Sequence, residues 1–131
     1  MLKLITIVEI PGPGDHTGVF TNVGIKKDKD ENGVEFEHLV SKVDLDATDS
    51  TGKKFQLEKT YKINMPRGVT AFRNDFFEWS GRKLTDYELS KFDADTLMSG
   101  KPVKLVVRHR KDGKKTVAVI ERFLRTVIPQ A

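Results

Sequence analysis

Residues 54–79 read KFQLEKTYKINMPRGVTAFRNDFFEW, and the spacing of the apolar residues changes halfway along this stretch. Over residues 54–63 apolar side chains alternate with polar ones, and a period of two indicates a β-strand with one buried face. Lys59 is the one charged residue on that apolar face. Further on, the apolar positions lie three or four residues apart, which is the spacing of one face of an α-helix. These helical positions are Val69, Phe72, Phe76 and Trp79. The stretch predicts a strand followed by a helix whose aromatic stripe packs into the core.

A second, shorter helix is predicted a few residues later. Thr85 is placed as an N-cap with Glu88 three residues after it, the arrangement of a capping box. Leu84 and Leu89 are spaced for the hydrophobic staple that accompanies such a start. The helical pattern fades by residues 99–100.

β character lies on both sides of this helical part, with turn residues between the segments. Besides the strand predicted over residues 54–63, the upstream segments are residues 2–10, 18–26 and 34–45. The downstream segments are residues 103–108 and 117–127. The last two are joined by residues 109–116, HRKDGKKT, in which Asp112-Gly113 is typical of a hairpin turn. These eight residues therefore connect two antiparallel strands.

The order of three strands, a helix and two strands predicts a mainly β domain with a helical insert. The same order is that of the OB-fold, a five-stranded Greek-key barrel with a helix between strands three and four. Residues 18–26 would start the barrel, and residues 2–10 would be an extra N-terminal strand. That strand either closes the barrel or pairs with a second copy in a homo-oligomer. The main alternative is a β-sandwich with a helical insertion.

Length and composition fit one domain over residues 1–131. The chain has no cysteine, which excludes disulfides and thiolate metal sites. No segment approaches the ~18 to 20 consecutive apolar residues of a membrane span. We therefore expect a cytoplasmic protein with no membrane association.

Charge is unevenly distributed along the chain. Residues 1–100 contain 14 basic and 17 acidic side chains, a net charge of −3. Residues 101–131 contain nine basic and two acidic side chains, a net charge of +7. A cationic end on a nearly neutral domain favours a polyanionic partner.

Motifs for catalysis or metal binding are weak. Residues 28–33, DKDENG, match the first half of a calcium-binding EF-hand loop, but Leu39 stands where the bidentate glutamate is needed. The three histidines share no metal-ligand spacing, and no nucleophile motif is present. We therefore expect a non-catalytic protein without metal or cofactor. A small enzyme would need a deep pocket with convergent titratable groups.

The expected fold suggests where a nucleic acid would bind. OB-folds bind oligonucleotides across strands two and three, between the loops that follow strands one and four. Those loops would be residues 26–31 and the basic HRKDGKKT loop. The candidate nucleic-acid-binding residues are Lys54, Tyr61, Phe77, Lys104, Arg108, Arg110, Lys111, Lys114 and Lys115. The cations would contact phosphates, and the two rings would stack on bases. The alternatives are a hairpin that is merely solvated and a module that binds proteins with the same β-barrel.

One stretch resembles a known family. It consists of residues 79–89 (WSGRKLTDYEL), Phe92-Asp93, Leu97, Gly100-Lys101-Pro102 and the apolar strand Val103–His109. This pattern is similar to one found in small bacteriophage and prophage OB-fold proteins that are described as single-stranded DNA-binding proteins. The resemblance implies a binding module of phage replication or recombination, with proteins of those systems as partners in the bacterial host cell. It carries over no individual binding residue, and it leaves the choice between DNA and RNA open.

Overall fold

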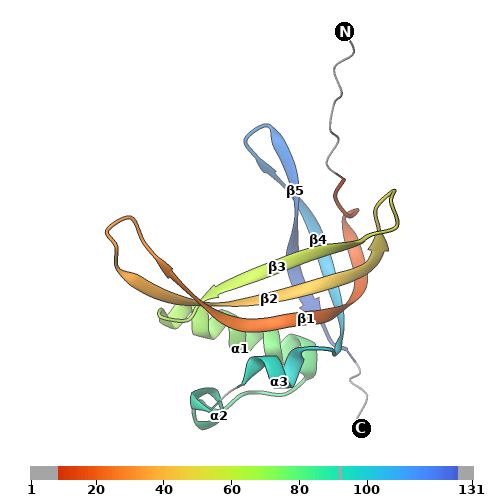
Figure 1. Ribbon diagram of the computed structural model, residues 1–131. Helices are drawn as coiled ribbons and strands as arrows, with labels where there is room; N and C mark the ends of the chain where they lie inside the picture. Colours follow the sequence, from red (N-terminus) through yellow and green to blue (C-terminus); the bar gives the residue numbers. More distant parts are fainter. Residues whose placement is uncertain (1–8, 92, 127–131) are drawn as a thin grey trace.

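Five antiparallel strands form one sheet, and three helices lie between the third and fourth strands, in a computed structural model of the chain (Figure 1). The structure describes residues 9–91 and 93–126. The elements are β1 (Gly14–Lys29), β2 (Glu35–Thr48), β3 (Lys54–Lys62), α1 (Pro66–Ser80), α2 (Asp86–Ser90), α3 (Ala94–Met98), β4 (Pro102–Asp112) and β5 (Lys115–Leu124). The predicted mainly β architecture with a helical insert is confirmed. Most of the strand predicted over residues 2–10 lies outside the described residues, and Glu9 and Ile10 belong to no strand.

The strand order is β3-β2-β1-β4-β5, so the long strand β1 joins the two halves of the sheet. Residues 14–19 of β1 pair with β4, and residues 18–29 pair with β2. Gly18 belongs to both ladders, and a β-carbon there would lie 2.3 Å from the carbonyl oxygen of Asp44. A bulge between Phe20 and Asn22 follows. Glycine and the bulge together let β1 bend from one half of the sheet into the other.

The sheet is open between its two ends, β3 and β5. Residues of the two strands lie near each other, but no ladder joins them in the described part of the chain. The closed barrel expected from the sequence is therefore not formed. Helix α1 packs against both strands at this gap, and the side chain of Lys59 lies there over the ring of Phe123 at 5.8 Å. Side chains from three elements thus fill the space that a backbone ladder would need.

The aromatic stripe of α1 lies in the core, as its spacing predicts. Phe72, Phe76 and Trp79 are all buried. The Trp79 ring meets the Phe20 ring edge to face, with centroids 5.1 Å apart, and its indole Nε1 donates to the Pro102 carbonyl at 3.0 Å. These contacts join α1 to both halves of the sheet, because Phe20 belongs to β1 and Pro102 begins β4.

The helical part after α1 differs from the single helix predicted there. The capping box of Thr85 and Glu88 is present at the start of α2. That helix ends at Ser90, and Asp93 then caps a separate helix, α3, by accepting from the Thr96 amide. A second N-cap residue supplies the acceptor that lets a new helix begin. Among the helices of residues 9–91 and 93–126, none is long and apolar enough to cross a membrane.

The described N-terminal residues cross the end of the sheet opposite the helices. The Glu9 carboxylate accepts from the Ser50 amide and hydroxyl in the turn between β2 and β3. Two residues later the Pro11 carbonyl lies 2.7 Å from the ring Nε2 of His109 on β4. These two contacts connect the β2–β3 turn to β4 across the core.

Candidate nucleic-acid interface

Strands β1, β2 and β3 present an outer face, which is the side of the sheet away from the core. Side chains alternate between the two faces of a strand, so the neighbours of the buried Val23, Leu39 and Tyr61 face outward. The strand registers arrange these outward residues in rows across the three strands. The rows are Lys26–His38–Lys62, then Gly24–Val40–Thr60, then Asn22–Lys42–Glu58. A hollow of about 470 Å³ lies against these rows, and its lining includes all three residues of the middle row.

Two rings lie side by side on the β2 part of this outer face. Phe36 and His38 are half-buried, with ring centroids 5.2 Å apart and planes at 79°. They are two residues apart on one strand, so both side chains point to the same side. The His38 ring is also 3.9 Å from the Asp28 carboxylate of β1. A pair of partly exposed rings on a sheet is a surface on which a nucleobase can stack.

Cations flank these rings. Lys26 on β1 and Lys62 on β3 are the direct cross-strand partners of His38. Both side chains are exposed, and within residues 9–91 and 93–126 neither is in an ion pair. The face is not purely cationic, because Glu58 lies beside Lys42 and Asp28 lies beside Phe36. Free ammonium groups at both sides of a ring can contact the phosphates on either side of a stacked base.

The HRKDGKKT loop is a protruding hairpin, as its sequence predicts (Figure 1). Strands β4 and β5 extend so far that only Gly113 and Lys114 remain as the turn, with Gly113 at a φ of 65°. The predicted cations are all exposed, but the alternation of side chains divides them. Lys104, Arg108 and Arg110 share the outer face of β4, Lys111 points to the opposite side, and Lys114 and Lys115 lie at the tip.

The two rings predicted to stack on bases lie elsewhere. Tyr61 is only 3% exposed, and its hydroxyl donates to the Asp75 carboxylate at 2.5 Å. Burial, followed by the charge of Asp75, raises the pKa of Tyr61 well above its ordinary value. Because the ring is enclosed, Tyr61 presents no exposed face on which a base could stack. Phe77 is half-buried on α1 beside the Arg125 guanidinium (5.2 Å) and the Lys83 ammonium (5.7 Å), so it does not join the outer face of the sheet.

Lys54 is exposed at the first position of β3, beside the β2–β3 turn. It has the same outward orientation as Lys62, but it lies at the opposite end of the strand. Of the predicted residues, Lys54 alone belongs to the outer face of β1, β2 and β3.

The sequence patterns did not identify Phe36 and His38 as candidate site residues. They also did not indicate that Lys26 and Lys62 lie on either side of the His38 ring. The segment 34–45 has apolar residues at both odd and even positions, so its pattern does not say which set faces the core. One signal was available, since Phe36 and His38 share a parity and follow closely on the Asn32-Gly33 turn. The two lysines lie beside these rings only because β2 pairs with β1 on one side and with β3 on the other.

Comparison with known proteins does not identify a family for this chain. The chain matches no protein-family model, and no curated protein is significantly similar to it. Across the described ranges, no three histidine, aspartate or glutamate side chains are grouped so that they could hold a metal ion. The outer face of the sheet, with the residues that the fold brings together there, is therefore the feature from which a function can be inferred.

Proposed function

We propose that the protein binds single-stranded nucleic acid, with DNA as the first choice, across the outer face of β1, β2 and β3. The row Lys26–His38–Lys62, with Phe36 beside it, carries the proposal. Stacking of a base on an aromatic ring contributes about 1–3 kcal/mol and tolerates any sequence, since every base has a π-face. The lysines would bind the phosphates that follow and precede that base.

The arrangement of the strands supports the same proposal. Strand β1 lies between β2 and β4, and the helices come just before β4. The OB-fold has this order and is a partly open barrel, and it binds oligonucleotides on its second and third strands. An OB-type domain with an open β3–β5 gap thus accounts for the sheet order. The resemblance of residues 79–109 to phage single-stranded DNA-binding proteins agrees with this and suggests a role in phage replication or recombination.

Replacing Phe36 with alanine is expected to weaken binding of a single strand by about tenfold, the effect of losing one stacked base. The measurement is the fluorescence anisotropy of a labelled oligonucleotide of about 30 nucleotides, which is longer than the site of one OB-fold. A duplex of the same sequence serves as the competing ligand. Binding of the wild-type protein that is no tighter for the single strand than for the duplex would contradict the proposal, as would full affinity in the Phe36→Ala variant.

Lys26→Ala/Lys62→Ala should reduce the slope of log affinity against log salt by about 1.4, because each phosphate contact with a single strand contributes about 0.7. Lys91→Ala is the matched control, since Lys91 is exposed at the end of α2, away from the sheet. Its salt slope should equal that of the wild-type protein. Equal slopes for the double variant and the control would show that the lysine row contacts no phosphate.

The hairpin is tested separately with Lys111→Ala/Lys114→Ala/Lys115→Ala. If the hairpin closes over the bound strand, this variant should bind severalfold more weakly at low salt and nearly normally at high salt, since surface charges are then screened. The same anisotropy titration at two salt concentrations measures it. Unchanged affinity at low salt would identify the basic tip as a solvated turn that lies outside the interface.

A further inference from the structure

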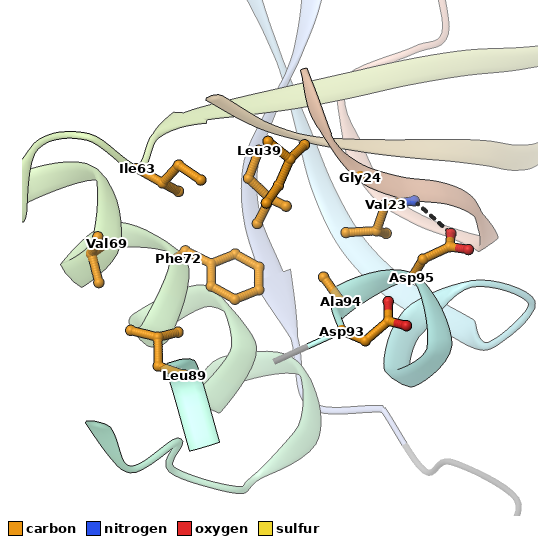
Figure 2. A pocket seen from close by; sticks show the side chains of 11 residues that line it. Val23, Gly24, Leu39, Ile63, Val69, Phe72, Leu89, Asp93, Ala94 and Asp95 are labelled. Carbon is orange, nitrogen blue, oxygen red and sulfur yellow. Dashed lines mark hydrogen bonds between the residues drawn. The ribbon is translucent and has the colours of Figure 1, made fainter. Parts of the chain in front are cut away.

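A second hollow lies on the opposite, inner side of the sheet, between the sheet and the three helices (Figure 2). Its volume is about 450 Å³, within the range of about 300–1,000 Å³ typical of ligand sites. The Phe72 ring lies in its middle, with Val69 and Leu89 on one side and Ala94 on the other. Most of its lining is thus apolar, and the hollow is open to solvent.

Ile25 stands at the mouth of this apolar hollow. It is 61% exposed, although it pairs with the buried Leu39 and therefore faces the inner side of the sheet. An exposed isoleucine beside an apolar hollow offers surface whose removal from water would stabilise a complex. The described part of the chain provides no side chain that covers it.

Carboxylates lie at one end of the hollow and in a smaller hollow beyond its other end. Asp93 and Asp95 line one end, and in residues 9–91 and 93–126 neither is in an ion pair (Figure 2). Hydrogen bonds from Thr96 lower the pKa of Asp93 and keep it ionised at neutral pH. Past Ile63 the surface continues into a smaller hollow lined by Glu35 and Glu37.

Among the residues that line the two hollows, which together form the inner groove, one is a cation. It is Lys27 of the smaller hollow, whose ammonium lies 4.0 Å from the Glu37 carboxylate. Four carboxylates against one ammonium give the inner groove a net negative charge. Phosphates of a nucleic acid or of an anionic membrane would be repelled there. The groove therefore suits a ligand that combines an apolar group with positive charge.

We propose that this inner groove binds a short segment of a partner protein in which leucine, isoleucine or phenylalanine is flanked by lysine or arginine. The apolar side chain enters the hollow beside Phe72 and covers Ile25. The flanking cations lie against Asp93 and Asp95 at one end and against the glutamates at the other. Complementary charge selects the basic segment, and the buried apolar side chain supplies most of the affinity. The main hollow is on the inner side of the sheet and the proposed nucleic-acid face is on the outer side, although Gly24, Ile25 and Phe36 line hollows at the edge between them. Peptide binding and oligonucleotide binding are measured separately, so the failure of one proposal leaves the other standing.

The probe is a fluorescein-labelled Lys-Lys-Leu-Phe-Lys-Lys peptide titrated with the purified protein. Two matched peptides test the two parts of the proposal: Lys-Lys-Ser-Ser-Lys-Lys lacks the apolar anchor, and Glu-Glu-Leu-Phe-Glu-Glu reverses the charge. The first peptide should bind saturably and should shift the amide resonances of Val23 and Ala94, which line this hollow. The other two should bind at least about tenfold more weakly. Absence of binding by the first peptide, or equal binding of the acidic peptide, would overturn the proposal.

Ile25→Ser should weaken binding of the Leu-Phe peptide by about tenfold, because it removes exposed apolar surface at the mouth. Val34→Ser is the matched control: Val34 is 59% exposed, close to the value for Ile25, but it does not line the hollow. The control should bind like the wild-type protein. Equal affinities for the two variants would place the peptide outside the groove. Asp93→Asn keeps an N-cap for α3 and should weaken binding severalfold at low salt only.

Discussion

Replacing Asp75 with alanine is expected to lower the free energy of unfolding by about 3 kcal/mol, the usual cost of removing one partner from a buried ion pair. The Asp75 carboxylate on α1 accepts from the Lys59 ammonium at 2.6 Å and from the Tyr61 hydroxyl at 2.5 Å. The Lys59 and Asp75 side chains are only 29% and 18% exposed. Without the carboxylate, a half-buried cation and a buried hydroxyl would both lose their partner, and α1 would lose its polar connection to β3.

Urea denaturation of the purified variant measures this effect. The matched control is Asp86→Ala, because Asp86 also pairs with a cation, Arg73, at 2.8 Å but is almost fully exposed. Exposed ion pairs contribute about 0–1 kcal/mol, so this control should stay close to the wild-type protein. Equal losses for the two variants would show that burial of the Lys59–Asp75 pair has no influence on its contribution. Tyr61→Phe should cost only about 1 kcal/mol, since it removes one hydrogen bond and leaves the ion pair.

Replacing Gly68 with alanine is expected to destabilise the protein by about 3 kcal/mol, at the upper end of the usual cost of overpacking. Gly68 lies in the first turn of α1, and a β-carbon there would be 1.8 Å from the carbonyl oxygen of Lys62 and 2.4 Å from its carbonyl carbon. Both atoms are backbone at the end of β3, so the start of the helix or the end of the strand would have to move. Helix propensity alone predicts the opposite sign, a gain of about 1 kcal/mol.

Thr70→Ala, two residues further along α1, is the matched control. Thr70 is exposed, so alanine there meets no neighbour and should stabilise the helix by a few tenths of a kcal/mol. Thermal unfolding of both variants by circular dichroism gives the comparison. A Gly68→Ala variant as stable as the wild-type protein would mean that α1 and β3 can separate at this point without cost. Because Lys62 belongs to the proposed binding row, we also expect Gly68→Ala to weaken binding of single strands.

The secondary structure follows well from local patterns. The alternation in residues 54–63 and the stripe from Val69 to Trp79 predict β3 and α1, and both are present. Thr85 and Glu88 form the predicted capping box, and the predicted hairpin is present, with Gly113 and Lys114 as its turn residues. Each of these signals involves residues within a few positions of one another, so its physical cause is complete in the local sequence.

The candidate sites follow much less well. The sequence marks Lys59 as a charge on an apolar face, but only packing of α1 on β3 brings Asp75 to it. Tyr61 is on the same face, and its sequence position is compatible both with the rim of the sheet and with the core. Burial is stable because the hydroxyl of Tyr61 donates to the Asp75 carboxylate of α1. The HRKDGKKT loop attracts attention by its charge alone, although its cations point in different directions.

Local sequence patterns are sufficient to predict the mainly β class, the helical insert before the fourth strand, the core role of the α1 rings and the basic hairpin. Three features depend instead on how distant segments pack: the sheet stays open between β3 and β5, Phe36 and His38 face outward beside Lys26 and Lys62, and the apolar inner groove has carboxylates along it. The physical reason is the range of the interactions. Periodicity shows that a strand has two faces, but the pairing of segments distant in the sequence determines which face is buried and which side chains share a row.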